Sequence, residues 1–125
     1  MKATNYNDGY IRVYKEKNKE SDFGARKNIK TFDDLEFIVK LAYKECSKRQ
    51  QDFDFAESRN RTLNIKIKTR FYKNISNYDK IVINNILYDI VYIDIDKENR
   101  ELYFYLEEVR TIAWWYKTSI RRIRL

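Results

Sequence analysis

The fold is decided by residues 61–110, RTLNIKIKTRFYKNISNYDKIVINNILYDIVYIDIDKENRELYFYLEEVR. Within them, residues 62–71 alternate apolar and polar side chains, which is the period-two pattern of a strand with one buried face. The predicted core face carries Leu63, Ile65, Ile67, Thr69 and Phe71, and the predicted solvent face carries Asn64, Lys66, Lys68 and Arg70. No helical periodicity interrupts residues 61–110, so they predict successive antiparallel hairpins.

The first hairpin is predicted around Asn84 and Asn85, between strands at 80–83 and 86–94. Asparagine tolerates the positive φ that both positions of a two-residue type I′ turn require. This turn sets Lys80 opposite Asp89 and Ile81 opposite Tyr88, which pairs unlike charges and apolar side chains.

The second hairpin is predicted from a polar turn at 96–99 and a strand at 101–109. Pairing Ile93 with Leu102 places Val91 opposite Phe104 on the core side. A bulge near residue 90, or burial of both faces, would reconcile the two hairpins. The opposite, outward side then carries Ile90, Tyr92, Tyr103 and Tyr105, a candidate subunit interface because tyrosine is enriched where subunits meet.

The remaining segments complete a single all-β domain over residues 1–125, predicted to be a small antiparallel barrel of five to seven strands. Strands are expected at 10–16 and 35–45, with a mobile loop at 17–32. Residues 46–60 fit either a short helix over 47–58, capped by Ser47, or an extended loop.

Composition argues against enzymes and metal proteins. The chain has no histidine, one cysteine (Cys46) and two glycines, so no general base, metal framework or glycine-rich phosphate loop is apparent. We expect no cofactor.

The longest apolar runs are far shorter than the roughly 20 residues that cross a bilayer, and no secretory signal is visible, so a soluble intracellular protein is expected.

The positive charge is concentrated at the C-terminal end. Residues 110–125 contribute +5 of the net +7 and contain no acidic residue. They hold the aromatic residues Trp114, Trp115 and Tyr116 and then the arginines Arg121, Arg122 and Arg124. Three interpretations stay open: an arm that docks on an adjacent protein ring, an arm that touches DNA, or an additional strand of the barrel.

Three segments carry a family resemblance: residues 61–70 (RTLNIKIKTR), 78–91 (YDKIVINNILYDIV) and 99–109 (NRELYFYLEEV). Together they resemble the head-closure proteins of tailed bacteriophages, also called stopper or head–tail joining proteins. Their order is a basic-ended strand, a strand before a tight turn, a strand carrying Tyr-Asp-Ile and a closing strand after a charged turn. The resemblance covers residues 33–109.

The resemblance implies a subunit of a ring, most often of twelve copies, beneath the portal and adaptor rings of a siphophage head. Such a ring encloses double-stranded DNA without sequence-specific binding, helps retain the genome and presents the surface for the tail. The expected location is therefore the virion, after synthesis in the host bacterial cytoplasm. Whether the isolated chain is monomeric stays open.

In that family the segment between the second and third strands closes the central channel. The matching residues here are Ser47, Lys48, Arg49, Gln50, Gln51, Asp52, Phe53, Asp54, Phe55, Ala56, Glu57 and Ser58, with the loop ending at Asn60.

Individual side chains in this segment have two interpretations each. Asp52, Asp54 and Glu57 either face the DNA channel, where acidic walls avoid binding phosphate, or merely solvate a loop. Phe53 and Phe55 pack either between neighbouring loops of a ring or within one subunit.

The basic strand at Lys66, Lys68 and Arg70 leaves a competing function open. It would suit a barrel that binds single-stranded nucleic acid, or it serves solubility only. Within virion assembly, an adaptor or tail-terminator subunit is the alternative, although an adaptor would be expected to show dominant helices.

Overall fold

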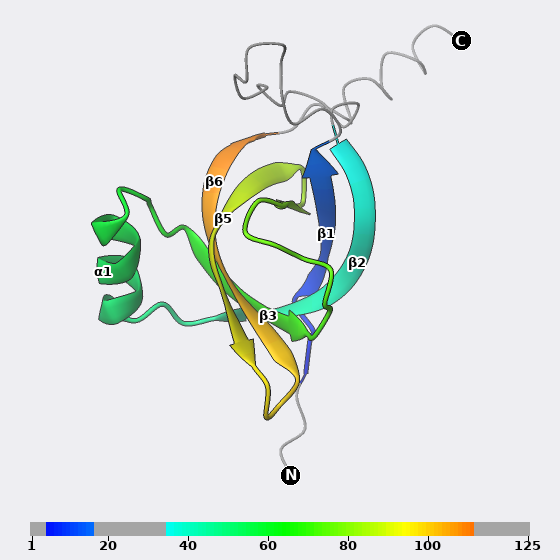
Figure 1. The fold of residues 1–125 in the computed structure, drawn as a ribbon, viewed down its shortest axis with the longest axis horizontal. Helices are drawn as coiled ribbons and strands as arrows, with labels where there is room; N and C mark the ends of the chain where they lie inside the picture. The colour runs from blue at the N-terminus through cyan, green and yellow to red at the C-terminus, as the bar shows by residue number, and fades with distance from the viewer. Residues whose placement is uncertain (1–4, 17–34, 112–125) are drawn as a thin grey trace, which may run out of the picture.

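The computed structural model describes residues 5–16 and 35–111, which form a closed six-stranded antiparallel barrel with one helix on its outside (Figure 1). The elements are β1 (Gly9–Glu16), β2 (Leu35–Cys46), α1 (Gln50–Ser58), β3 (Ile65–Arg70), β4 (Lys80–Ile83), β5 (Ile86–Asp96) and β6 (Glu101–Thr111). Around the barrel the strands follow the order β1-β2-β3-β6-β5-β4, and β4 closes onto β1. The predicted all-β barrel is confirmed. The predicted mobile loop at 17–32, and Trp114, Trp115, Tyr116, Arg121, Arg122 and Arg124, lie outside the described residues.

The barrel interior is filled by one side of each strand. Ile11 and Val13 of β1, Ile67 of β3, Ile81 of β4 and Phe104 of β6 are all fully buried in one cluster. The alternation seen in residues 62–71 accounts for Ile67 and Thr69, which are buried as predicted, whereas Phe71 lies beyond the end of β3 and is exposed. The side chains that alternate with these along each strand point out of the barrel.

The first hairpin has the predicted register. Lys80 lies opposite Asp89 and Ile81 opposite Tyr88, and the Lys80 ammonium donates to the Asp89 carboxylate at 2.6 Å. Asn84 and Asn85 have φ values of 49° and 71°, so both turn residues are left-handed. The sequence signal succeeded here because the turn length alone fixes the register of a tight hairpin.

Replacing Asn84 with valine should destabilise the fold by about 1–2 kcal/mol, because a β-branched residue is strained at positive φ. Asn84→Gly should stay within about 0.5 kcal/mol of the wild type, since glycine adopts this conformation freely. Urea unfolding monitored by circular dichroism measures both. Equal stabilities for the two variants would contradict a left-handed residue at this position.

The second hairpin differs from its predicted register by two residues. Ile93 lies opposite Phe104 rather than Leu102, and Leu102 faces Ile95. The turn occupies 97–100, one residue later than predicted, with Arg100 at φ 55°. The predicted bulge near residue 90 is confirmed, since the register shifts between Ile90 and Tyr92.

This bulge decides which side chains of β5 face outward. Ile90 lies inside the barrel with only 3% of its surface exposed, so its predicted place on an outward interface is wrong. Tyr92 lies opposite Tyr105 on the outer wall, and the two ring centroids are 5.9 Å apart. The predicted pairs of Tyr92 with Tyr103 and of Ile90 with Tyr105 do not form.

The segment between β2 and β3 contains a helix, which settles the choice that the sequence left open. α1 begins after Arg49, which is the N-cap residue in place of the predicted Ser47. The Asp52 carboxylate accepts a hydrogen bond from the Arg49 amide at 2.9 Å. A carboxylate in the first turn pairs with an amide that has no partner within the helix, and the positive end of the helix dipole stabilises its negative charge. Neither α1 nor any other helix in the described ranges is long and apolar enough to cross a membrane.

Candidate functional site

α1 lies against the outer wall of the barrel, where β3, β6 and β5 run side by side (Figure 1). Its buried residues are Asp52 and Ala56, one helical turn apart, with Phe55 half-buried between them. Ala56 packs with Leu63 and with Val91. Val91 has no partner in the β5–β6 register, so the bulge is what turns this apolar side chain outward to meet the helix.

A buried ion pair joins α1 to the barrel. The Lys66 ammonium on β3 lies 3.1 Å from the Asp52 carboxylate, and the two side chains are only 4% and 8% exposed. The ammonium also lies 5.1 Å from the centroid of the Tyr105 ring, within cation–π distance. Burial lowers the pKa of Lys66, but the hydrogen bond to Asp52 and the neighbouring Tyr105 raise it more, so the net pKa shift is upward. The predicted solvent exposure of Lys66 is therefore wrong.

Asp52 should make folding stability depend on pH. Burial raises the pKa of this carboxyl, but hydrogen bonds from the Arg49 amide and the Lys66 ammonium outweigh burial and hold the pKa below its usual value. Because the unfolded value is near 3.9, the contribution of Asp52 is complete above about pH 5 and is lost as the pH falls through the folded pKa.

Asp52→Asn should therefore lose less unfolding free energy than the wild type when the pH falls from about 5 to about 2. Asp54→Asn, which removes an exposed carboxylate of the same helix, is the control for the change in net charge. Urea titrations across this pH range measure the slopes. Parallel curves for Asp52→Asn and the wild type would show that Asp52 makes no such contribution.

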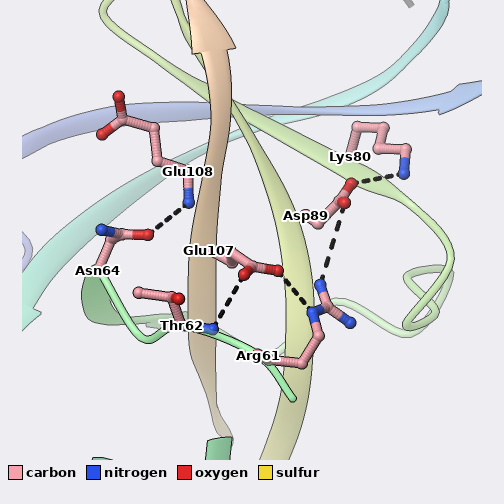
Figure 2. A network of polar contacts seen from close by, with 7 residues as sticks. All are labelled: Arg61, Thr62, Asn64, Lys80, Asp89, Glu107 and Glu108. Carbon is pink, nitrogen blue, oxygen red and sulfur yellow. Dashed lines mark hydrogen bonds and ion pairs between the residues drawn. The ribbon is translucent and has the colours of Figure 1, made fainter. Parts of the chain in front are cut away.

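The chain leaving α1 is fastened to β6 and β5 by a polar network (Figure 2). The Arg61 guanidinium bonds to the Glu107 carboxylate and lies 3.9 Å from Asp89, while the Thr62 amide donates to the second Glu107 oxygen at 2.9 Å. Asn64 extends this attachment: its side-chain oxygen accepts from the Glu108 amide at 2.7 Å. We call Arg61, Thr62, Asn64, Glu107 and Glu108 the β6 clamp.

The other end of the connection is tied to the same place. Lys48, before α1, donates from its ammonium to the Asn64 carbonyl at 2.9 Å. The Arg61 amide donates to the Ala56 carbonyl at 2.9 Å, which turns the chain back along the helix. Residues 47–64 are therefore an ordered attachment on the barrel surface, positioned by an ion pair, a small apolar cluster and the β6 clamp.

A small pocket of about 240 Å³ lies beside α1 and is lined by Gln51, Asp52, Phe55, Tyr92 and Tyr105. The Phe55 and Tyr92 ring centroids are 5.2 Å apart, and the Arg59 guanidinium lies 4.4 Å from the Phe55 centroid. Phe55 thus packs within its own subunit, which is one of the two alternatives that the sequence left open.

The predicted channel-facing carboxylates do not share one environment. Asp52 is buried against Lys66, so in this conformation it cannot line a channel. Asp54 and Glu57 are exposed on α1, and Phe53 is 39% exposed beside them. Asp54 accepts a hydrogen bond from the Gln50 side chain at 3.0 Å. The exposed face of α1 is therefore acidic with one aromatic ring.

The predicted basic stripe on β3 is largely neutralised. Lys66 pairs with Asp52, and the Lys68 ammonium lies 3.8 Å from the buried Glu101 carboxylate. Glu101 also accepts from the Tyr6 hydroxyl at 2.7 Å, and burial together with this hydrogen bond raises the pKa of Tyr6 to about 12. Arg70 is exposed, with the Tyr6 ring 5.5 Å away. Alternation alone gives no sign of these acidic partners, because they come from distant segments.

Among residues 5–16 and 35–111, no group of three or more histidine, cysteine, aspartate or glutamate side chains is arranged to hold a metal ion. A scan against models of known protein families found no match to this chain, and a search of curated proteins found none either.

Proposed function

We propose that this chain is a structural subunit of the head-closure ring that joins a DNA-filled phage head to its tail. The segments that carry the sequence resemblance form β3, β4–β5 and β6, which make up a continuous wall of the barrel. A closed barrel leaves few free strand edges, which suits a rigid building block in a symmetric assembly.

The observation that carries the proposal is the position and attachment of α1. It lies between β2 and β3, the place to which the resemblance assigns the channel-closing segment, and it lies on the outside of the barrel wall (Figure 1). Its exposed face presents Phe53, Asp54 and Glu57. In a ring, carboxylates facing DNA would avoid phosphate contacts, and the ordered attachment of residues 47–64 would hold that face in place.

Deletion of the reading frame from the source genome tests the proposal. The expected particles are heads that package DNA and then lose it, together with unattached tails of normal length, and the wild-type chain supplied in trans should restore joining. Unjoined heads that keep their DNA would indicate a role further from the portal. Overlong tails would indicate a tail terminator instead. Infectious tailed particles from the deletion would refute any connector role.

The channel role of α1 needs its own variant. Asp54→Lys with Glu57→Lys reverses the charge of the exposed face and leaves the Asp52–Lys66 pair intact. We expect joined particles whose DNA ejection is impaired, because the new ammonium groups would bind phosphate. The control is Asp94→Lys, an exposed carboxylate on β5 outside α1. Equal ejection by both variants and the wild type would remove α1 from the channel.

A barrel that binds single-stranded nucleic acid is the second candidate, favoured by Tyr103 and Tyr105 beside the basic strand β3. The pairing of Lys66 with Asp52 and of Lys68 with Glu101 weakens it, because paired cations have less charge to offer phosphates. Fluorescence anisotropy with an oligonucleotide separates the two: tight binding that falls steeply with salt would favour the nucleic-acid function.

A further inference from the structure

One end of the barrel carries an exposed apolar groove. Residues 71–79 connect β3 to β4 and pack Tyr72 and Ile75 against the core cluster. Between this connection and the β5–β6 hairpin lies a groove of about 400 Å³. Its lining residues are Phe71, Tyr72, Lys73, Ile75, Ser76, Asn77, Tyr78, Ile93, Ile95 and Leu102. Ile95 is 50% exposed and Tyr78 is 82% exposed, so the groove presents apolar surface that the described residues leave uncovered.

The same groove adjoins an open strand edge. β4 pairs with β5 only from Ile86 to Asp89, so within the described ranges β5 has β6 as its one strand partner from Ile90 to Asp96. No backbone hydrogen bond joins the connection at 71–79 to this part of β5. An open edge beside an apolar groove is the arrangement that accepts an added strand: backbone bonds give affinity, and side chains in the groove give selectivity.

We propose that residues 112–125 of a second copy of this chain occupy the groove, with Trp114 and Trp115 as the apolar anchors. These residues directly follow β6 and hold both tryptophans of the sequence, with Trp114, Trp115 and Tyr116 in succession. Tryptophan and tyrosine in apolar pockets are the side chains that most often dominate binding energy at protein interfaces.

The length of the segment argues for a second copy over the same chain. Thr111 pairs with Ile86, at the end of the β5–β6 ladder far from the groove. Leu102 lies nine residues back from Thr111, about 30 Å along the strand. Tyr116 follows Thr111 by only five residues, which span at most about 18 Å when fully extended. The aromatic residues therefore fall short of the Leu102 end of the groove in their own barrel.

A contact between one end of a subunit and the opposite end of the next is heterologous, so its repetition gives a closed ring or an open chain. It would supply a subunit contact that a ring requires. The inference goes beyond the proposed function because it concerns the purified chain alone. A negative result here would leave the virion role to another contact, whereas a virion without this chain would leave the self-association intact.

Tryptophan emission tests the docking directly, because Trp114 and Trp115 are the only tryptophans in the sequence. We expect the emission to shift to shorter wavelength as protein concentration rises, in step with an increase in mass by sedimentation velocity. A monomer with water-exposed emission at all concentrations overturns the inference. A monomer with short-wavelength emission at all concentrations shows docking within one chain or burial elsewhere, and also overturns it.

Two variants locate the contact. Ile95→Glu places a charge in the groove and should weaken self-association at least ten-fold. Val109→Glu is the matched control: Val109 is also a half-exposed β-branched residue of the same hairpin, toward the other end of the ladder, and its association should stay within two-fold of the wild type. Circular dichroism verifies that both variants fold. Wild-type association of Ile95→Glu excludes the groove as the site.

Mixing two defective chains gives the sharpest result. The double variant W114A/W115A keeps the groove but lacks the anchors, and Ile95→Glu keeps the anchors but lacks the groove. Each alone should be monomeric, whereas the mixture should form a complex of two chains and no larger species, with the emission of Ile95→Glu shifted to shorter wavelength. No complex in the mixture, or larger oligomers of either variant alone, contradicts head-to-tail docking.

Discussion

Lys66→Met should lower the free energy of unfolding by about 3–5 kcal/mol, because it leaves the Asp52 carboxylate buried without its cation. Methionine retains most of the length of lysine, so the loss reports on charge more than on volume. The Asp52–Lys66 contact joins α1 to β3, so the helix should also exchange its amide hydrogens faster than in the wild type. Urea unfolding and hydrogen exchange followed by mass spectrometry measure the two effects.

The double variant Asp52→Leu with Lys66→Met is the matched control. Replacing both members of a buried ion pair with apolar side chains is often neutral or stabilising, so much of the loss should be recovered, apart from the roughly 1 kcal/mol of the Arg49 amide hydrogen bond. Together with the single variant Asp52→Leu, the double-mutant cycle then gives the coupling between the two residues. A stability for Lys66→Met within about 1 kcal/mol of the wild type would show that the pair does not hold α1 on the barrel.

Phe104→Ala should cost about 3–5 kcal/mol, the usual range for removing a fully buried aromatic side chain. Phe104 lies on β6 opposite Ile67 of β3 and Ile93 of β5, so its ring fills the interior between three strands. The cavity left by alanine would face strands that close a ring and have little freedom to collapse. Urea unfolding of the full chain, followed by circular dichroism, gives the value.

Two controls separate this core contribution from general sensitivity to mutation. Phe104→Leu keeps most of the apolar volume and should cost less than about 1.5 kcal/mol. Val109→Ala, at an exposed position of the same strand, should stay within about 0.5 kcal/mol. A small loss for Phe104→Ala, similar to that of Val109→Ala, would be inconsistent with a ring packed at the centre of a closed barrel.

The sequence was informative wherever local chemistry determines structure. The Asn84-Asn85 turn predicted the left-handed backbone and the pairing of Lys80 with Asp89, because a two-residue turn permits one register. Alternation predicted the strands and the burial of Ile67 and Thr69. The β-branched and aromatic content of residues 35–45 indicated β2.

Prediction failed where distant segments meet. Lys66 has the parity of a solvent-facing residue, and it is buried only because α1 covers that part of β3 and supplies Asp52. The predicted register of the second hairpin was wrong by two residues, because the four-residue turn begins one position later than the polar run suggested. Longer turns restrict register less than tight ones, so the sequence could not fix this pairing.

The bulge at Val91 was predictable in position but not in structural role. The need for a bulge near residue 90 followed from the conflict between the two hairpins, and the structure has one there. Its purpose was not visible in the sequence, since Val91 gains its partners Ala56 and Leu63 only when the connection at 47–64 folds onto the wall. The candidate site therefore depends on the bulge with its apolar cluster, on the β6 clamp and on one ion pair between residues 14 positions apart.

An electron cryomicroscopy reconstruction of the neck in particles from the source genome would show whether this barrel is a building block of the head–tail connection, as we propose. We expect a ring of six-stranded barrels beneath the portal and adaptor, with α1 directed toward the channel. A neck whose density is fully explained by other chains would refute the proposal.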